Sequence, residues 1–183
     1  MPGLNLSLVD IPTGSSLVRD SNRDFRGRVE LRGGLPKLFA HGAQWVRADF
    51  HLHTRADKEF RYDCAEDRFV ASYINALEAA GTRLAVITNH NKFDLDEFKA
   101  LRKRGRKSGI GVLPGVELSV KDGANGVHTL VVFSDAWLAD GQDYINQFSG
   151  VAFSGRVPWH YEQENGRSND DLVDTFKMLE GYH

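Results

Sequence analysis

The chain has 183 residues, of which 41% are hydrophobic and 26% are charged, and its formal net charge is −2. This length suffices for one domain with a hydrophobic core, and the composition excludes an intrinsically disordered chain. A net charge this close to zero argues against wholesale electrostatic capture of nucleic acid or of a membrane, which leaves only local charged patches for such contacts.

The beginning of the chain differs from the rest. Residues 1–44 are rich in Gly, Ser, Pro and Arg and have weak apolar periodicity. We interpret them as an N-terminal extension, in which residues 29–32 are a candidate edge strand. From residue 45 the pattern becomes regular, and we treat residues 45–183 as one domain.

The domain opens with two strands and a helix. Residues 45–50 alternate in the manner of a strand, and residues 66–80 place apolar side chains at helical spacing before Gly81. Residues 84–88 are continuously apolar, which is typical of a short strand covered on both faces.

A second helix is clearly signalled. Asp94 and Glu97 have the spacing of a helix-capping pair, and Gly109 ends the helix, with Phe98 and Leu101 as its buried side chains. The helix is followed by one or two strands over residues 110–120, which Pro114 and Gly115 interrupt.

The last elements complete an alternating order. Residues 121–126 have turn chemistry, residues 128–133 form an apolar strand, and a final helical pattern covers residues 170–179. Strands that alternate with helices favour an α/β sheet or barrel with parallel strands.

Side chains that bind metals follow the predicted strands. His51 and His53 come directly after the first strand, His90 follows the second, and Glu117 lies just beyond Gly115. The carboxyl ends of parallel strands meet at one edge of the sheet, so these groups are expected to converge. His128 opens its strand instead, so its place at the same edge follows less directly.

The residue types suit a metal-dependent hydrolase. His51 and His53 are two residues apart, so in an extended segment both imidazoles project to one side and can chelate one ion. The Glu117 carboxylate can bridge two ions, which at about 3.5–4 Å apart ionise a shared water. A His-x-His pair alone is weak evidence; its conjunction with Glu117, His90 and His128 predicts a metal site.

Four segments carry these residues: 49–54 (DFHLHT), 87–91 (ITNHN), 114–117 (PGVE) and 128–132 (HTLVV). In order and spacing they resemble the successive motifs of the polymerase and histidinol phosphatase (PHP) family, over roughly residues 45–135. The resemblance implies an α/β fold of the distorted (β/α)7 TIM-like barrel type, which holds two or three Mn, Zn or Fe ions and hydrolyses phosphate esters.

The resemblance also implies roles for individual residues. His51, His53 and Glu117 are expected to hold one ion, Glu117 and His128 a second, and His90 part of a third site. We assign the catalytic role to His51, His53 and Glu117.

A further ligand is expected about six residues after His53. Glu59 stands at that position, with Asp57 and Asp63 nearby. The ligand could be any of the three carboxylates, and we favour Glu59.

Two departures from the family pattern stand out. Asn89 occupies a position where the family usually has Asp, which is expected to alter a hydrogen bond behind the ligands rather than a ligand. The family also closes its site with an Asp-x-His pair, and after His128 this chain has only His160 and His183. We therefore interpret the barrel as incomplete and the chain as the N-terminal piece of a longer protein; a site that works with fewer ligands is the alternative.

Substrate and partners are expected from resemblance and from charge. The segment 57–60 (DKEF) is similar to PHP modules that precede larger ATPases tied to DNA repair or phage defence. This implies a phosphorylated substrate, a nucleotide or nucleic acid among the options, and an ATPase domain as partner. Arg55 and Lys92 are candidates for substrate-phosphate contacts, and a structural role for them is equally open. For the basic run 102–107, a solvated helix end is favoured over a phosphate-binding patch.

Three functions remain open at this point. The leading one is a phosphoesterase with a metal-activated water as nucleophile. The others are a non-catalytic, metal- or nucleotide-binding regulatory module and an amide-cleaving hydrolase. The single cysteine, Cys64, favours a reducing, cytoplasmic setting, and no apolar run approaches the ~20 residues of a membrane span.

Overall fold

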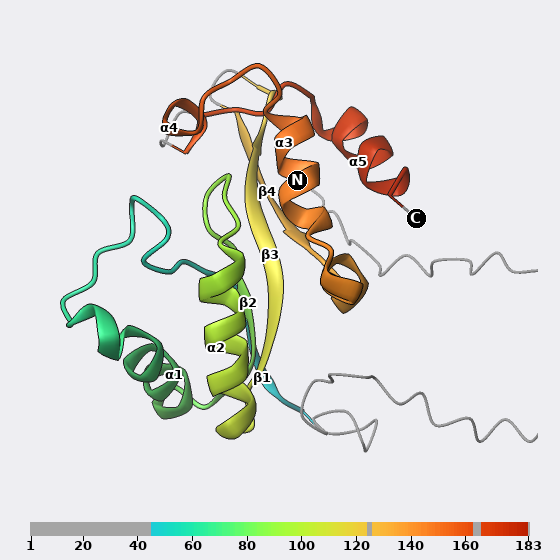
Figure 1. Cartoon of the computed structure of the whole chain (residues 1–183). Coiled ribbons are helices and arrows are strands. Elements are labelled where there is room, and N and C mark those ends of the chain that lie inside the picture. The colour runs from blue at the N-terminus through green and yellow to red at the C-terminus, as the bar shows by residue number, and fades with distance from the viewer. Residues whose placement is uncertain (1–44, 124–125, 163–165, 183) are drawn as a thin grey trace, which may run out of the picture. The chain divides into compact units, whose positions relative to one another are not determined.

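A four-stranded sheet with helices against one face forms the part of the chain that the structure describes (Figure 1). The computed structural model describes residues 45–123, 126–162 and 166–182, all within the unit Arg32–His183. The N-terminal extension and its candidate strand at residues 29–32 lie outside the described residues. None of the described helices has the length and apolar character needed to cross a membrane.

The described elements follow the predicted alternation and add helices near the C-terminal end. In chain order they are β1 (Arg47–Leu52), η1 (Glu66–Arg68), α1 (Phe69–Ala79), β2 (Thr82–Ile87), α2 (Leu95–Lys107), β3 (Gly111–Val120), β4 (Val127–Val132), η2 (Asp135–Gly141), α3 (Tyr144–Ala152), α4 (Pro158–Tyr161) and α5 (Leu172–Glu180). The α/β prediction is confirmed. β3 runs through Pro114 and Gly115 as one strand, and α3 is a helix that the sequence pattern did not indicate.

The sheet has the order β1-β2-β3-β4. β1, β2 and β3 are parallel, but β4 is antiparallel to β3, so the expectation of parallel strands is wrong for β4. Gly123 and Gly126, with φ of 71° and 82°, have the left-handed backbone that the reversal between the two strands uses. As a result the start of β4 lies beside the end of β3.

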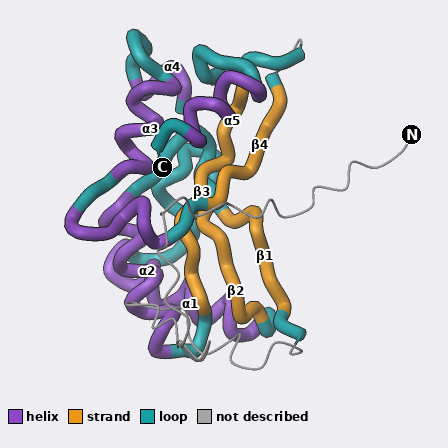
Figure 2. Tube along the Cα trace, turned by 90° about the vertical axis from the view of Figure 1, so that its right-hand side faces the viewer, coloured by secondary structure: helices purple, strands orange, loops and turns teal. Residues whose placement is uncertain are grey.

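The helices cover one face of a curved sheet (Figure 2). β3, in the interior of the sheet, is buried along nearly its whole length, as its apolar sequence indicates. Phe98 and Leu101 of α2 are 2% and 0% exposed, which confirms them as the buried side of that helix. Asp94 caps α2 as expected, with its carboxylate accepting a hydrogen bond from the Glu97 amide at 2.9 Å.

Gly115 is a point of close packing inside the sheet. A β-carbon there would lie 2.9 Å from Val86 Cγ1, from Thr88 Cγ2 and from the Val131 carbonyl oxygen. We expect Gly115→Ala to lower the free energy of unfolding by about 1–3 kcal/mol, because the added methyl overpacks a rigid site that includes backbone. Urea denaturation measures the change.

Gly150 of α3 provides the matched control. A β-carbon at Gly150 would have no atom of the described residues within 4 Å. Gly150→Ala is therefore expected to leave stability unchanged or to raise it by up to about 1 kcal/mol, through the better helix propensity of alanine. Equal effects of the two substitutions would contradict the packing argument at Gly115.

Candidate metal centre

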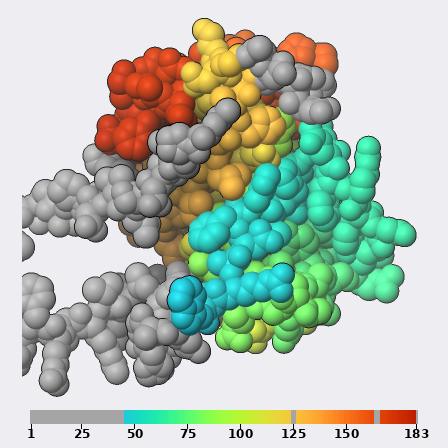
Figure 3. Space-filling view, turned by 180° about the vertical axis from the view of Figure 1, so that it is seen from behind, coloured from blue at the N-terminus to red at the C-terminus, as the bar shows by residue number. Residues whose placement is uncertain are grey.

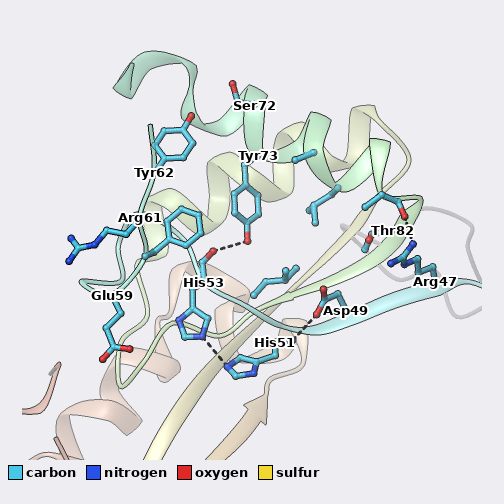
Figure 4. Close-up of a pocket in the computed structure, with 15 residues that line it drawn as sticks. Arg47, Asp49, His51, His53, Glu59, Arg61, Tyr62, Ser72, Tyr73 and Thr82 are labelled. Carbon is cyan, nitrogen blue, oxygen red and sulfur yellow. Dashed lines mark hydrogen bonds between the residues drawn. The ribbon is translucent and has the colours of Figure 1, made fainter. Parts of the chain in front are cut away.

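Three potential metal ligands, from the end of β1 and from β3 on the other side of β2, converge at one edge of the sheet. His51 Nε2 lies 3.0 Å from Glu117 Oε2, His53 Nε2 lies 3.2 Å from the same oxygen, and the two imidazole nitrogens are 2.9 Å apart. Figure 4 shows the two imidazoles turned toward each other. β1 lies at the surface (Figure 3), and the His51 side chain is 50% exposed, whereas the Glu117 side chain is 7% exposed.

A cation fits this set of donor atoms. Ligand atoms arranged tetrahedrally around a zinc ion are about 3.4 Å apart, close to the separations observed here. Three atoms that each carry a lone pair repel one another at such distances unless a proton or a metal ion lies between them. His51, His53 and Glu117 therefore form a group that could hold a metal ion.

Asp57 orients His53 toward this group. Its Oδ2 accepts hydrogen bonds from His53 Nδ1 at 2.6 Å and from the His90 amide at 2.7 Å, and its Oδ1 accepts from the Glu59 amide at 2.9 Å. Burial alone would raise the pKa of Asp57, but these hydrogen bonds lower it to about 2. An ionised carboxylate only accepts, so Nδ1 of His53 carries its proton and Nε2 is left to face Glu117.

The second oxygen of Glu117 contacts His128. Glu117 Oε1 lies 2.7 Å from His128 Nδ1. His128 is opposite Ser119 in the β3–β4 ladder, so the antiparallel course of β4 brings it to the edge where β3 ends. Burial would raise the pKa of Glu117, but hydrogen bonds from His51 and His128 outweigh burial and lower it. Glu117 is thus an ionised carboxylate with imidazoles at both oxygens.

We call His51, His53, Glu117 and His128 the cluster. His90 lies behind it. Its ring stacks on that of His128 at a centroid distance of 5.1 Å, and its Nε2 lies 2.7 Å from Ser119 Oγ. Burial lowers its pKa, which favours the neutral imidazole. Among the described residues the buried Nδ1 has no hydrogen-bond partner, and Glu59 Oε1 lies 4.0 Å from it.

The three carboxylates that follow His53 have different surroundings. Asp57 is buried and already bonded to protein donors. The Glu59 side chain is 48% exposed and lines the same cavity as His51 and His53. Asp63 is exposed and does not line that cavity. Of these three carboxylates, Glu59 is the one that faces the cavity and could bind a metal ion there.

Asn89 joins the loops that carry the histidines. Its Oδ1 accepts a hydrogen bond from the Thr54 amide at 2.7 Å, and its Nδ2 donates to Thr54 Oγ1 at 2.9 Å. Both residues are buried. Asn89 therefore fixes the positions of its neighbour His90 and of His53 without contacting the cluster itself.

The two predicted phosphate-binding cations have protein partners. Arg55 donates from Nε to Glu97 Oε2 at 2.7 Å, and its guanidinium lies over the Phe69 ring at 5.1 Å. Lys92 Nζ lies 3.5 Å from Glu162 Oε2. The structure thus places Arg55 in contacts with α1 and α2, and Lys92 in an ion pair.

Asn91 was not singled out in the sequence, although it connects several segments. It has a left-handed φ of 51°, its Oδ1 accepts from the Ser119 amide at 2.8 Å, and its Nδ2 donates to the Tyr161 carbonyl at 2.7 Å. Asparagine tolerates this backbone conformation better than most residues, which was the one signal available in the sequence.

A cavity of about 770 Å³ opens beside the cluster, between β1 and α1 (Figure 4). His51, His53 and Glu59 line one end of it, and Phe60 and Tyr73 line its wall. This volume is within the range of small-molecule sites. A metal centre here would therefore be reachable by a substrate.

Models of protein families, curated proteins and solved structures were all compared with this chain, and none matched. The case for a function therefore depends on the geometry of the site and on the motifs of the sequence.

Proposed function

We propose that this chain is a metal-dependent phosphoesterase of the PHP type. The observation that carries the proposal is the environment of Glu117, an ionised, buried carboxylate that has His51 and His53 at one oxygen and His128 at the other. A carboxylate with nitrogen ligands on both sides has the arrangement expected of a bridge between two ions.

The ligand sets follow from these contacts. One ion would be held by His51, His53 and Glu117 Oε2, and a second by Glu117 Oε1 and His128. The unpartnered Nδ1 of His90 and the Glu59 carboxylate are the candidates for a third. Bound Mn, Zn or Fe ions would supply an activated water and Lewis-acid stabilisation of charge on phosphorus.

The surrounding residues support the same proposal. Asp57 keeps His53 in the tautomer whose Nε2 can bind a metal, and Asn89 holds the loops of the two histidine motifs together. The curved sheet is consistent with part of a distorted (β/α)7 barrel. A nucleotide or nucleic acid substrate, a cytoplasmic location and an ATPase domain in the complete protein belong to the proposal through the motif resemblance.

Metal analysis and turnover test the proposal together. We expect the purified protein to contain bound Mn, Zn or Fe and to hydrolyse p-nitrophenyl phosphate with added Mn, with activity lost on chelation and restored by the metal. His51→Ala is expected to lose activity, whereas His160→Ala, an exposed histidine outside the cluster, is the control. Fewer than one bound ion per chain would overturn the proposal.

A regulatory module remains the second candidate. The observation that favours it is the open side of the cluster, where the His51 side chain is half-exposed. An open centre can bind metal or nucleotide without enclosing a substrate for reaction. Tight metal binding without turnover of any phosphate ester would favour this function over hydrolysis.

A further inference from the structure

We propose that Lys58 and Lys92 form a subsite for a second phosphate group of the substrate, and that the carboxylate of Glu162 occupies this subsite in place of that phosphate. The inference rests on the proposed phosphoesterase function and adds a substrate class to it. The substrates would be molecules that carry one phosphate at the metal centre and another beside it.

The geometry of the three charges is the first argument. Lys58 Nζ lies 3.4 Å from Glu162 Oε2, and Lys92 Nζ lies 3.5 Å from the same oxygen. The Glu162 side chain is 14% exposed, while those of Lys58 and Lys92 are 45% and 32% exposed. One carboxylate neutralises only one of two ammonium groups, whereas a phosphate dianion would neutralise both.

The second argument is the position of the lysines relative to the metal centre. Lys58 lies between Asp57, which bonds to His53, and Glu59, which faces His90. Lys92 is two residues beyond His90. The two ammonium groups therefore project from the same loops that supply ligands to the cluster.

The third argument is that the described residues on either side of Glu162 are held by contacts that do not involve its side chain. Asn91 Nδ2 donates to the carbonyls of Tyr161 and Gly166, at 2.7 and 3.1 Å, on either side of Glu162. The Ser168 amide donates to the Ser119 carbonyl at 2.8 Å. These contacts hold Tyr161, Gly166 and Ser168 independently of the two ion pairs, so the Glu162 side chain can rotate away when an anion binds.

The chemistry indicates a compound with two phosphate groups. The lysine ammonium is a point charge on a flexible side chain and can donate to phosphates in various orientations, unlike the fixed fork of the arginine guanidinium. The second group could be the next phosphate of a nucleoside diphosphate or that of an oligonucleotide. Both sources present the same chemistry to Lys58 and Lys92, and the experiment separates them.

The test compares a ligand with two phosphates and a ligand with one. The dissociation constants of α,β-methylene-ADP and of inorganic phosphate are measured by calorimetry on the metal-loaded protein, and a dinucleotide with a terminal phosphate is the oligonucleotide arm. We expect Glu162→Gln to tighten the binding of α,β-methylene-ADP or of the dinucleotide about three- to tenfold. Lys58→Ala and Lys92→Ala are expected to weaken the binding of the same ligand by a similar factor. The dissociation constant of inorganic phosphate is expected to change less than about twofold in each of these variants.

Asp174→Asn is the matched control, because it removes a lysine–carboxylate pair elsewhere in the chain, in which Lys177 Nζ of α5 lies 2.8 Å from Asp174 Oδ1. It is expected to change no dissociation constant. If Glu162→Gln weakens both two-phosphate ligands or leaves them unchanged, the subsite is refuted, even where p-nitrophenyl phosphate hydrolysis upholds the phosphoesterase. If hydrolysis is absent but the binding changes occur, the subsite stands and the phosphoesterase fails.

Discussion

Glu117→Ala is expected to remove metal binding and to reduce hydrolysis of p-nitrophenyl phosphate at least about a hundredfold, because it deletes the one carboxylate that every other group of the cluster contacts. The backbone of Glu117 donates to the Asn89 carbonyl at 3.2 Å and accepts from the Asn91 amide at 2.8 Å. Alanine keeps both bonds, so the loops that carry the histidines should remain in place.

Glu117→Gln separates the charge of this residue from its shape. The amide retains one acceptor oxygen but loses the negative charge that offsets two ions, so we expect the metal content per chain to fall and turnover to stay low. Added Mn should raise the melting temperature of the wild-type protein and of His160→Ala, but not that of either Glu117 variant. Full metal content and activity in Glu117→Ala would exclude the proposed bridge.

Local sequence patterns were sufficient to predict the α/β character of the chain. The helix at α2 was predicted down to its cap because Asp94 and the apolar side chains Phe98 and Leu101 act within one helix. The strand at β2 was predicted because a short, continuously apolar run is typical of a strand covered on both faces. These signals depend on neighbours in the sequence and need no tertiary contact.

The direction of β4 and the continuity of β3 depend on tertiary pairing. Residues 121–126 indicated a turn, but turn chemistry alone does not say whether the next strand pairs with β3. Pro114 suggested a break, yet it pairs with Ile87, the last residue of β2, so its missing amide falls where the ladder to β2 ends. The periodicity of the sequence indicates neither the direction of β4 nor the continuity of β3.

The helix α3 lacked a clear signal in the sequence. Its residues Tyr144–Ala152 include asparagine, serine and glycine, which have modest or low helix propensity. The helix is stabilised instead by the Asp143 cap and by Ile145 and Phe148, which are both fully buried in the core. Tertiary burial thus overrides weak local preference here.

The convergence of His51, His53 and Glu117 was predictable, since each lies near the end of the parallel pairing and such ends share an edge. The strands extend farther than predicted, so His51 lies within β1 and Glu117 within β3, and only His53 follows its strand. The position of Glu162 was not predictable. It contacts Lys92, which is 70 residues earlier in the chain, and Lys58, which is 104 residues earlier, and no local sequence pattern indicates contacts over such separations.

Asp57→Asn is expected to weaken metal binding about 10–100-fold while leaving every proposed ligand in the chain. Oδ2 of Asp57 accepts from both His53 Nδ1 and the His90 amide, and an amide cannot match all three donors that the carboxylate serves. The ring of His53 should lose its fixed tautomer and orientation.

The pH dependence distinguishes this role from general damage. The hydrogen bond to Asp57 is the main cause of the raised pKa of His53, with burial opposing it. In the metal-free protein the pair stabilises the fold from above the ordinary Asp57 pKa of 3.8 up to the raised pKa of His53. The Asp57 contribution is lost as pH falls toward about 2, and the His53 contribution is lost as pH rises through its raised pKa.

Protons and metal compete for Nε2 of His53, so metal affinity in the wild-type protein should rise with pH until it passes the raised pKa of this group and then level off. In Asp57→Asn the pKa of His53 falls, so the metal affinity should level off at a lower pH. The affinity reached there should also be lower than in the wild-type protein. Metal titrations at several pH values measure both quantities. If the metal affinity falls but the pH at which it levels off is unchanged, Asp57 only supports the loop. If that pH is lower in the variant, Asp57 also sets the protonation of His53.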